Sequence, residues 1–389
     1  MKSNLENNDK IIKFPSNNGN YRKTFSKNGI IRFFEYFVLI SLLVIVIFIV
    51  NSDTSFNATN SVNTDTINLI SANNYDFQTY KEGYVLAKDG KISCYNTNQE
   101  LQWEVSGSKT QPTVKTNGKY CLVYYTQDNT AILTDGNKTK RINTDGNVQY
   151  GYVNKNGYFV LFVKETGLKN RLVVYNKNAE KLYYRDNPDR YIPNAVLSDN
   201  NYTLITSEIV TSSKNLSTKL VLTDIRKNKI ISNIGFNNDV VGGCFFVKKN
   251  EFICVLDSKL ISYSTSGKLK WQVELGERQL SKYSVDEGMI ALLFNEDDSA
   301  LTGSEVIFYN TKGKKLNSFK TDEKINNIFV FDNTALLTMN RQLMFINAKG
   351  KQLSSVDVAY DMKETLFLAT KKCALVLSNS HEARLITAQ

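Results

Sequence analysis

Residues 260–271 read LISYSTSGKLKW, which is an apolar strand, a turn that ends in glycine, and the start of a second strand. The same arrangement returns at residues 306–316 (VIFYNTKGKKL) and 343–353 (LMFINAKGKQL). The turn glycines of the three copies are Gly267, Gly313 and Gly350. A hairpin turn needs a positive φ at such a place, which glycine adopts at little cost. The stretch therefore predicts a β-hairpin that is repeated along the chain.

The repeat can be followed through most of the chain by the residue that ends its middle strand. These marker positions are Tyr95, Thr134, Tyr175, Thr223, Tyr263, Tyr309, Ile346 and Thr387. Their spacing is roughly 40 residues, which is the period of propeller blades. The two longest intervals contain the polar insertions 211–218 (TSSKNLST) and 295–303 (NEDDSALTG). In other copies Asn98-Gln99 and Asn178-Ala179 stand where the glycine is expected.

We predict an all-β fold, an eight-bladed β-propeller over residues 66–389, with seven blades and a spare hairpin as the alternative. The 21 Tyr, 21 Phe and only 4 Pro suit pleated, half-buried strands. The last repeat, residues 372–387, is short by a strand, and residues 66–70 (TINLI) belong to no repeat. We expect residues 66–70 to pair beside residues 384–387 as the outermost strand, because this closes the ring.

An uncharged apolar stretch, residues 37–50 (FVLISLLVIVIFIV), lies near the N-terminus. With the apolar residues before it, the stretch predicts one transmembrane helix over residues 33–50, since a span needs about 20 residues. Seven basic side chains lie in residues 1–35 and none in 51–80. Basic residues stay on the cytoplasmic side. We therefore expect a single-pass protein of the cell membrane, with residues 1–32 as a cytoplasmic tail and the C-terminal domain extracellular.

A cleaved signal peptide is the alternative to this span. Residues 51–60 (NSDTSFNATN) contain no small-residue cleavage motif, and the preceding basic region is long for a signal peptide. Residues 51–65 are polar throughout and predict a flexible linker. By random-coil statistics it would hold the next domain about 20 Å from the bilayer.

The copies that carry a glycine followed by a tryptophan resemble the repeat of the quinoprotein-dehydrogenase-like (PQQ-like, WD40-like) eight-bladed propellers. The resemblance rests on residues 260–275 (LISYSTSGKLKWQVEL) and on Trp103, which stands where Trp271 does. The order of tail, span and propeller resembles uncharacterised membrane-anchored propeller proteins of bacteria. The chain has only 2 Trp and no adjacent cysteine pair. The resemblance therefore does not extend to the cofactor of the quinoprotein dehydrogenases. The resemblance implies a fold, no cofactor and no activity.

The five cysteines fall within predicted strands among apolar neighbours. They are Cys94, Cys121, Cys244, Cys254 and Cys373. No C-x-x-C spacing occurs, so we interpret them as small buried side chains. One alternative stays open, because Cys244 and Cys254 flank the turn at residues 248–250 symmetrically. They could face each other across adjacent strands and form a disulfide in an oxidising exterior.

No catalytic, cofactor-binding or metal-ligating residue can be assigned from the sequence. His381 is the single histidine, which excludes chemistry that relies on two or more. The acidic loop 295–305 lacks the ligand spacing of a calcium loop and is read as a solvated insertion. The Asp-Gly pairs at 89–90, 135–136 and 145–146 predict hairpin turns.

The formal net charge is +10, and part of it belongs to the N-terminal tail, where it suits an anionic inner leaflet. No dense basic stripe with interleaved aromatic residues occurs, so nucleic acid is not expected as a partner. We expect a non-enzymatic scaffold or recognition module at the bacterial cell envelope. Its partners would be the bilayer, through residues 33–50, and an envelope protein or an anionic wall polymer. The alternative is a degenerate quinoprotein-like or carbohydrate-active enzyme.

Overall fold

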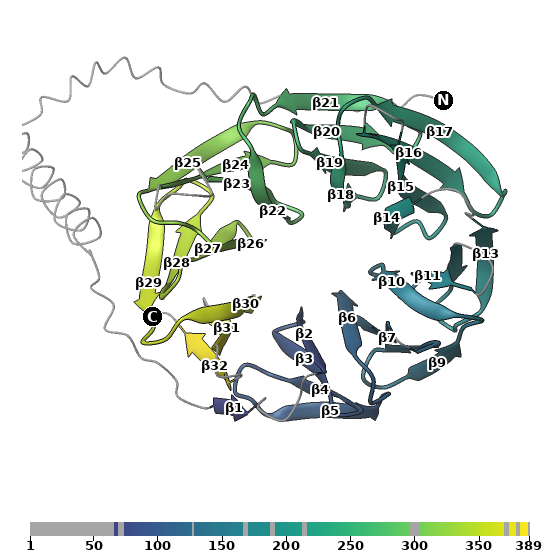
Figure 1. Cartoon of the computed structure of the whole chain (residues 1–389), viewed down its shortest axis with the longest axis horizontal. Helices are drawn as coiled ribbons and strands as arrows, with labels where there is room; N and C mark the ends of the chain where they lie inside the picture. The colour runs from purple at the N-terminus through teal and green to yellow at the C-terminus, as the bar shows by residue number, and fades with distance from the viewer. Residues whose placement is uncertain are drawn as a thin grey trace, which may run out of the picture. The chain divides into compact units, whose positions relative to one another are not determined.

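The strands of this chain form radial sheets around a common centre (Figure 1). The computed structural model describes residues 66–68, 74–126, 128–165, 170–186, 191–211, 216–295, 303–368, 373–378 and 382–387. The chain divides into two units, Met1–Asn57 and Ala58–Gln389, and all described residues lie in the second. These residues form eight antiparallel sheets of four strands each, which confirms the predicted eight-bladed propeller.

Blades 1 to 8 follow one another in chain order. Blades 1 to 7 each run from their innermost to their outermost strand, whereas blade 8 takes its outermost strand, β1, from the start of the domain. The innermost strands are β2 (Tyr75–Tyr80), β6 (Pro112–Asn117), β10 (Asn147–Val153), β14 (Tyr191–Leu197), β18 (Val241–Lys248), β22 (Leu280–Val285), β26 (Asn327–Phe331) and β30 (Met362–Leu368). The second strands are β3 (Gly83–Lys88), β7 (Tyr120–Tyr125), β11 (Phe159–Lys164), β15 (Thr203–Thr211), β19 (Glu251–Leu256), β23 (Met289–Asn295), β27 (Thr334–Thr338) and β31 (Cys373–Ser378). The third strands are β4 (Lys91–Tyr95), β8 (Thr130–Thr134), β12 (Arg171–Tyr175), β16 (Leu216–Asp224), β20 (Lys259–Ser264), β24 (Ser304–Asn310), β28 (Gln342–Asn347) and β32 (Glu382–Thr387). The outermost strands are β5 (Leu101–Ser106), β9 (Thr139–Asn143), β13 (Lys181–Asp186), β17 (Lys229–Phe236), β21 (Leu269–Glu274), β25 (Lys315–Thr321), β29 (Gln352–Asp357) and β1 (Thr66–Asn68).

Blade 8 is completed from both ends of the domain. Strand β1 pairs with β32, with Thr66 opposite Arg384 and Asn68 opposite Glu382. The predicted closing strand is thus confirmed at its predicted place, over Thr66–Asn68. Residues 69–70 of the predicted strand lie outside the described residues.

The apolar core is divided among the seams between blades. Eight clusters of buried side chains occur, and each draws its members from two neighbouring blades. Inner strands therefore have neighbours on both faces, and β23 (MIALLFN) is buried at every position from Met289 to Phe294. Outermost strands have one covered face, and β5 and β21 alternate between exposed and half-buried residues. This difference explains why the inner strands are continuously apolar rather than alternating.

The marker positions all lie at or near the ends of third strands, and a β-bulge explains their regularity. In six blades the register shifts between the third and fourth strands where the marker stands, for example between Ser262 and Tyr263. The turn that follows has a positive φ at its last residue. This residue is glycine at Gly267, Gly313 and Gly350, whereas Gln99 and Ala179 adopt φ of 63° and 66° without being glycine. The predicted equivalence of these turns is confirmed.

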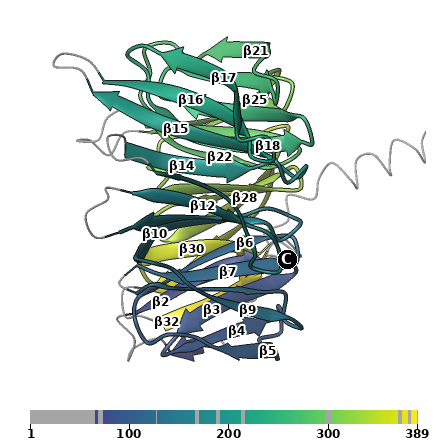
Figure 2. The same ribbon diagram turned by 90° about the vertical axis from the view of Figure 1, so that its right-hand side faces the viewer.

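The two faces of the ring differ in the connections they carry (Figure 2). The turn face holds the turns between first and second strands and between third and fourth strands. The loop face holds the remaining connections. Both insertions join a second strand to a third, β15 to β16 and β23 to β24, so both leave from the loop face. Their central residues, 212–215 and 296–302, lie outside the described residues.

Two of the three Asp-Gly turns are hairpins and one is not. Asp89-Gly90 joins β3 to β4 and Asp135-Gly136 joins β8 to β9. Asp145-Gly146 instead links β9 of blade 2 to β10 of blade 3, so this prediction was wrong. A crossing between blades can use the same polar residues as a hairpin, and the local sequence does not separate the two.

Among the described residues there is no helix of the length and apolarity that crossing a bilayer requires. The predicted span 33–50, the tail 1–32 and the linker 51–65 lie outside the described residues.

Replacing Thr66–Asn68 with Gly-Pro-Gly should lower the free energy of unfolding by about 2–3 kcal/mol. The reason is the loss of the ladder to β32, at about 1 kcal/mol for each backbone hydrogen bond. Urea denaturation followed by fluorescence measures the change, and the uncovered edge of β32 should also promote aggregation. The same replacement at residues 61–63 is the control and should leave stability unchanged.

Ala179→Gly should raise the free energy of unfolding by about 0.5–1 kcal/mol, because glycine removes the strain of a positive φ. Gly313→Ala is the matched control at the same place in the repeat. It should be destabilising, since its Cβ would lie 2.6 Å from the Trp271 ring. Equal stability of Ala179→Gly and the unmodified protein would contradict this reading of the repeat.

Candidate functional site

A cavity opens on the turn face at the centre of the ring. It has a volume of about 760 Å³, which lies within the 300–1,000 Å³ typical of ligand sites. Its lining comes from the ends of innermost strands and the turns that follow them, in blades 2, 3, 5, 6 and 7. We call it the turn-face cavity. No single blade could build it, because each contributes only two to four lining residues.

Aromatic side chains form part of the cavity wall. Tyr152 of β10 and Phe245 and Phe246 of β18 line it, together with Phe331 at the end of β26. Phe331 is 42% exposed, an unusual state for phenylalanine at the inner edge of a blade. Burial is the main cause that raises the pKa of Tyr152, with the charge of Asp199 adding to it, so this phenol stays neutral.

The aromatic wall continues into the seam between blades 5 and 6. Phe245 meets Tyr283 of β22 edge to face, with the ring centroids 5.9 Å apart. Gly243 makes this approach possible, because a Cβ there would lie 2.7 Å from the Tyr283 hydroxyl oxygen. Burial raises the pKa of Tyr283, with a further contribution from Cys244. The packing therefore holds Phe245 in a fixed position at the cavity.

Charged side chains rim the cavity on the turn face. Lys155, in the turn after β10, forms an ion pair with Glu287, in the turn after β22. These turns belong to blades 3 and 6, which are not neighbours, so the pair crosses the mouth of the cavity. Asp286 accepts a hydrogen bond from the backbone N–H of Asp332 at 3.0 Å, which joins the turns of blades 6 and 7. Both partners of the ion pair are exposed, so it is worth little stability and can open readily.

Side-chain hydrogen bonds tie neighbouring innermost strands around the turn face. They run from Thr79 Oγ1 to Phe367 O (2.8 Å), Thr116 Oγ1 to Thr79 O (2.6 Å), Asn117 Nδ2 to Val153 O (3.2 Å) and Asn154 Nδ2 to Ser198 O (2.9 Å). They connect blades 8, 1, 2, 3 and 4 in order. On the rim of the cavity, such a bond joins blades 2 and 3, and the bond between Asp332 and Asp286 joins blades 6 and 7.

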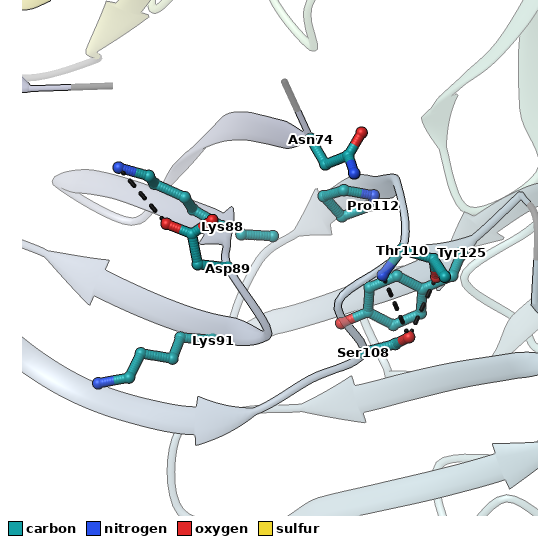
Figure 3. Close-up of a pocket in the computed structure, with 9 residues that line it drawn as sticks. Asn74, Lys88, Asp89, Lys91, Ser108, Thr110, Pro112 and Tyr125 are labelled. Carbon is teal, nitrogen blue, oxygen red and sulfur yellow. Dashed lines mark hydrogen bonds and ion pairs between the residues drawn. The ribbon is translucent and has the colours of Figure 1, made fainter. Parts of the chain in front are cut away.

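A second depression lies at the seam of blades 1 and 2 and is too small to be a site (Figure 3). Lys88 pairs with Asp89 at 3.6 Å on one side of it, and Ser108 bonds to Thr110 on the other. It has no volume that a water molecule could occupy.

Each of the two tryptophans packs its own blade against the next one in the chain. Trp103 of blade 1 covers Gly136 of blade 2, and Trp271 of blade 5 covers Gly313 of blade 6. A Cβ on either glycine would lie 2.6 Å from the indole ring. In blade 4 the smaller Ser232 takes this place against Gly267. The predicted equivalence of the two tryptophans is confirmed, and their role is to pack blades together.

Two carboxyl groups near the starts of β2 and β30 have raised pKa values. Burial raises the pKa of Asp76, although its carboxylate accepts the N–H groups of Val114 (2.6 Å) and Phe77 (2.9 Å), which oppose the shift. Burial also raises the pKa of Glu364, and the charge of Asp76 raises it further. They lie toward the loop face and do not line the turn-face cavity.

The residues singled out in the sequence lie apart from this cavity, with one exception. The five cysteines are buried, as expected, and of these only Cys244 lines the cavity. His381 lies outside the described residues. Over the described ranges, no group of three or more His, Cys, Asp or Glu side chains could hold a metal ion. The loops at 211–218 and 295–303 leave from the face opposite the cavity. The cavity residues themselves, Lys155 and Glu287 among them, were not anticipated.

The eight four-stranded blades, the tryptophan docking and the closing strand define a PQQ-like or WD40-like eight-bladed β-propeller. Residues 53–384 match the model of DUF5711, a family of unknown function, and the chain belongs to this family. No curated protein matches the sequence.

Solved structures share the fold at low sequence identity. BamB from Moraxella catarrhalis is 11% identical, with a TM-score of 0.53, over 84% of this chain and 97% of that one. Sqt1 from Saccharomyces cerevisiae is 8% identical, with a TM-score of 0.57, over 85% of this chain and 99% of that one. At these identities the likeness establishes the fold.

Glu364→Gln should stabilise the protein at pH 7 by only a fraction of a kcal/mol, because the residue is exposed and solvent screens its charge. A carboxyl whose pKa is raised on folding penalises the folded state once it ionises. The gain should therefore be absent at about pH 3, where Glu364 is almost fully protonated in both states, and should appear as the pH rises. Urea denaturation at the two pH values measures it. A gain that is independent of pH would contradict the electrostatic cause.

Proposed function

We propose that this protein is a membrane-anchored, extracytoplasmic propeller that binds a partner protein of the bacterial cell envelope without catalysing a reaction. The observation that carries the proposal is the turn-face cavity, a concave site assembled from five blades on a rigid ring. Rigid scaffolds that bring turns together at one place are where proteins commonly build recognition sites.

The anchoring part of the proposal rests on the sequence. Residues 33–50 would span the bilayer, residues 1–32 would stay in the cytoplasm, and residues 51–65 would tether the propeller outside. The basic tail and the absence of basic residues from 51 to 80 support this orientation.

The chemistry of the cavity favours a partner side chain with an apolar stem and a cationic head. Phe331 and Tyr152 offer aromatic surface, and cations bind to aromatic faces within about 6 Å. The charged residues that line the cavity are three carboxylates, Asp286, Glu287 and Asp332, and one cation, Lys155. A lysine or arginine of the partner could compete for Glu287 and enter between the turns.

The contact can be tested with a photoreactive amino acid at Lys249, which is exposed and lies two residues after the cavity residue Val247. On illumination of intact cells, we expect a specific adduct with one envelope protein. Phe331→Ala should lower the adduct yield about tenfold, equivalent to ~1.4 kcal/mol of binding. A membrane-impermeant amine reagent, added to the same cells, should label exposed lysines of the propeller.

Leu101→Ala is the matched control, because Leu101 is 53% exposed on the outer strand β5, away from the cavity. It should leave the adduct unchanged. An equal loss of adduct in both variants would show that the cavity is not where the partner binds. Labelling of the propeller only after cell lysis would contradict the outward orientation.

A further inference from the structure

Two buried thiols face each other across the innermost hairpin of blade 5. Cys244 of β18 is directly opposite Cys254 of β19 in the strand register. Their Sγ atoms are 2.6 Å apart. Both side chains are buried, with 4% and 0% exposed. No other pair among the five cysteines stands in such a register, since Cys94, Cys121 and Cys373 belong to three different blades.

The strand register of this pair is compatible with a disulfide. Directly opposite residues of antiparallel strands have Cα atoms about 4.5–5.5 Å apart. A disulfide accepts Cα separations of about 4.4–6.8 Å. Bulges flank the pair, between Val241 and Gly243 and between Phe246 and Lys248, so the ladder between them is short and can adjust.

We propose that Cys244 and Cys254 are a disulfide-forming pair that closes across β18 and β19 at the wall of the turn-face cavity. Cys244 lines the cavity, whereas Cys254 lies fully inside the blade. An incoming disulfide oxidant is therefore attacked by the thiolate of Cys244, which forms a mixed disulfide and releases one thiol. The thiolate of Cys254 then attacks Cys244 Sγ and expels the second thiol. Two electrons and two protons pass to the oxidant, which leaves as a dithiol or as two thiols.

The order of these steps follows from the surroundings of the two sulfur atoms. Burial, with the neighbouring Cys244 thiol, raises the pKa of Cys254 well above its usual value, so this thiol is a poor first nucleophile. Cys254 reacts only in the second step, when the neighbouring Cys244 Sγ carries a leaving group in the mixed disulfide.

The bond would also fix the cavity wall, because Phe245 and Phe246 follow Cys244 directly in β18. Whether the pair is bridged in the cell depends on the proposed outward location, since the cytosol keeps thiols reduced.

The test uses the full chain, purified with its thiols reduced and then incubated with oxidised glutathione. After unfolding and alkylation with iodoacetamide, mass spectrometry counts the adducts. Without oxidation, all five cysteines should be alkylated. After oxidation, two fewer adducts should form, and a digest should contain a peptide linked through Cys244 and Cys254. Full alkylation after oxidation, or a link between other cysteines, would overturn the proposal.

In Cys254→Ala the linked peptide should be absent, and oxidation should remove at most one adduct, because Cys244 then stays as a mixed disulfide with glutathione. Cys94→Ala, the control at another buried cysteine, should still lose two adducts and contain the linked peptide. Circular dichroism checks that both variants are folded. If a variant is not folded, the linked peptide of the unmodified chain still shows whether Cys244 and Cys254 form a disulfide. The redox state of the pair in intact cells, fixed by acid trapping of the thiols, tests the disulfide-forming pair and the outward location separately. A pair bridged in vitro but free in cells would support the disulfide-forming pair and overturn the outward location.

Discussion

Each blade of this protein has apolar side chains on both faces of its inner strands, and no blade can cover itself. The eight core clusters all lie between blades, so every blade needs two neighbours. A row of such sheets would leave an apolar face at each end, and only a closed ring covers all of them. The other features follow from this requirement: the short closing strand β1, the tryptophan docking at Gly136 and Gly313, and the hydrogen bonds that join innermost strands.

The fold could be predicted from the sequence because its determinants are local. The turn that contains Gly313 and the bulge at Tyr309 are specified within a few residues, and the chain repeats them. Even the closing strand was predictable, since residues 66–70 had no partner and the last repeat lacked a strand. The link at Asp145-Gly146 was misread because its short polar sequence suits either a hairpin or a crossing between blades. Only the tertiary arrangement distinguishes them.

The candidate site could not be predicted in the same way. Lys155 and Glu287 are far apart in the sequence and belong to different copies of the repeat, and neither stands out from the many charged residues of other turns. Their meeting depends on how the ring brings blades 3 and 6 together. Insertions attract notice in a sequence, yet the two here leave from the opposite face. In a repeat architecture, the sites arise where ordinary turns converge, and the conspicuous loops can lie elsewhere.

The position of β1 in blade 8 has a consequence for synthesis of the protein. This strand is the first of the described strands to leave the ribosome, and its partner β32 is the last. Blades 1 to 7 can form in order as they emerge, while β1 must wait until β32 has emerged. A chain that ends early keeps an unsealed apolar seam, which proteases and chaperones recognise. The pairing of β1 with β32 thus distinguishes chains that carry the whole propeller from chains interrupted before β32.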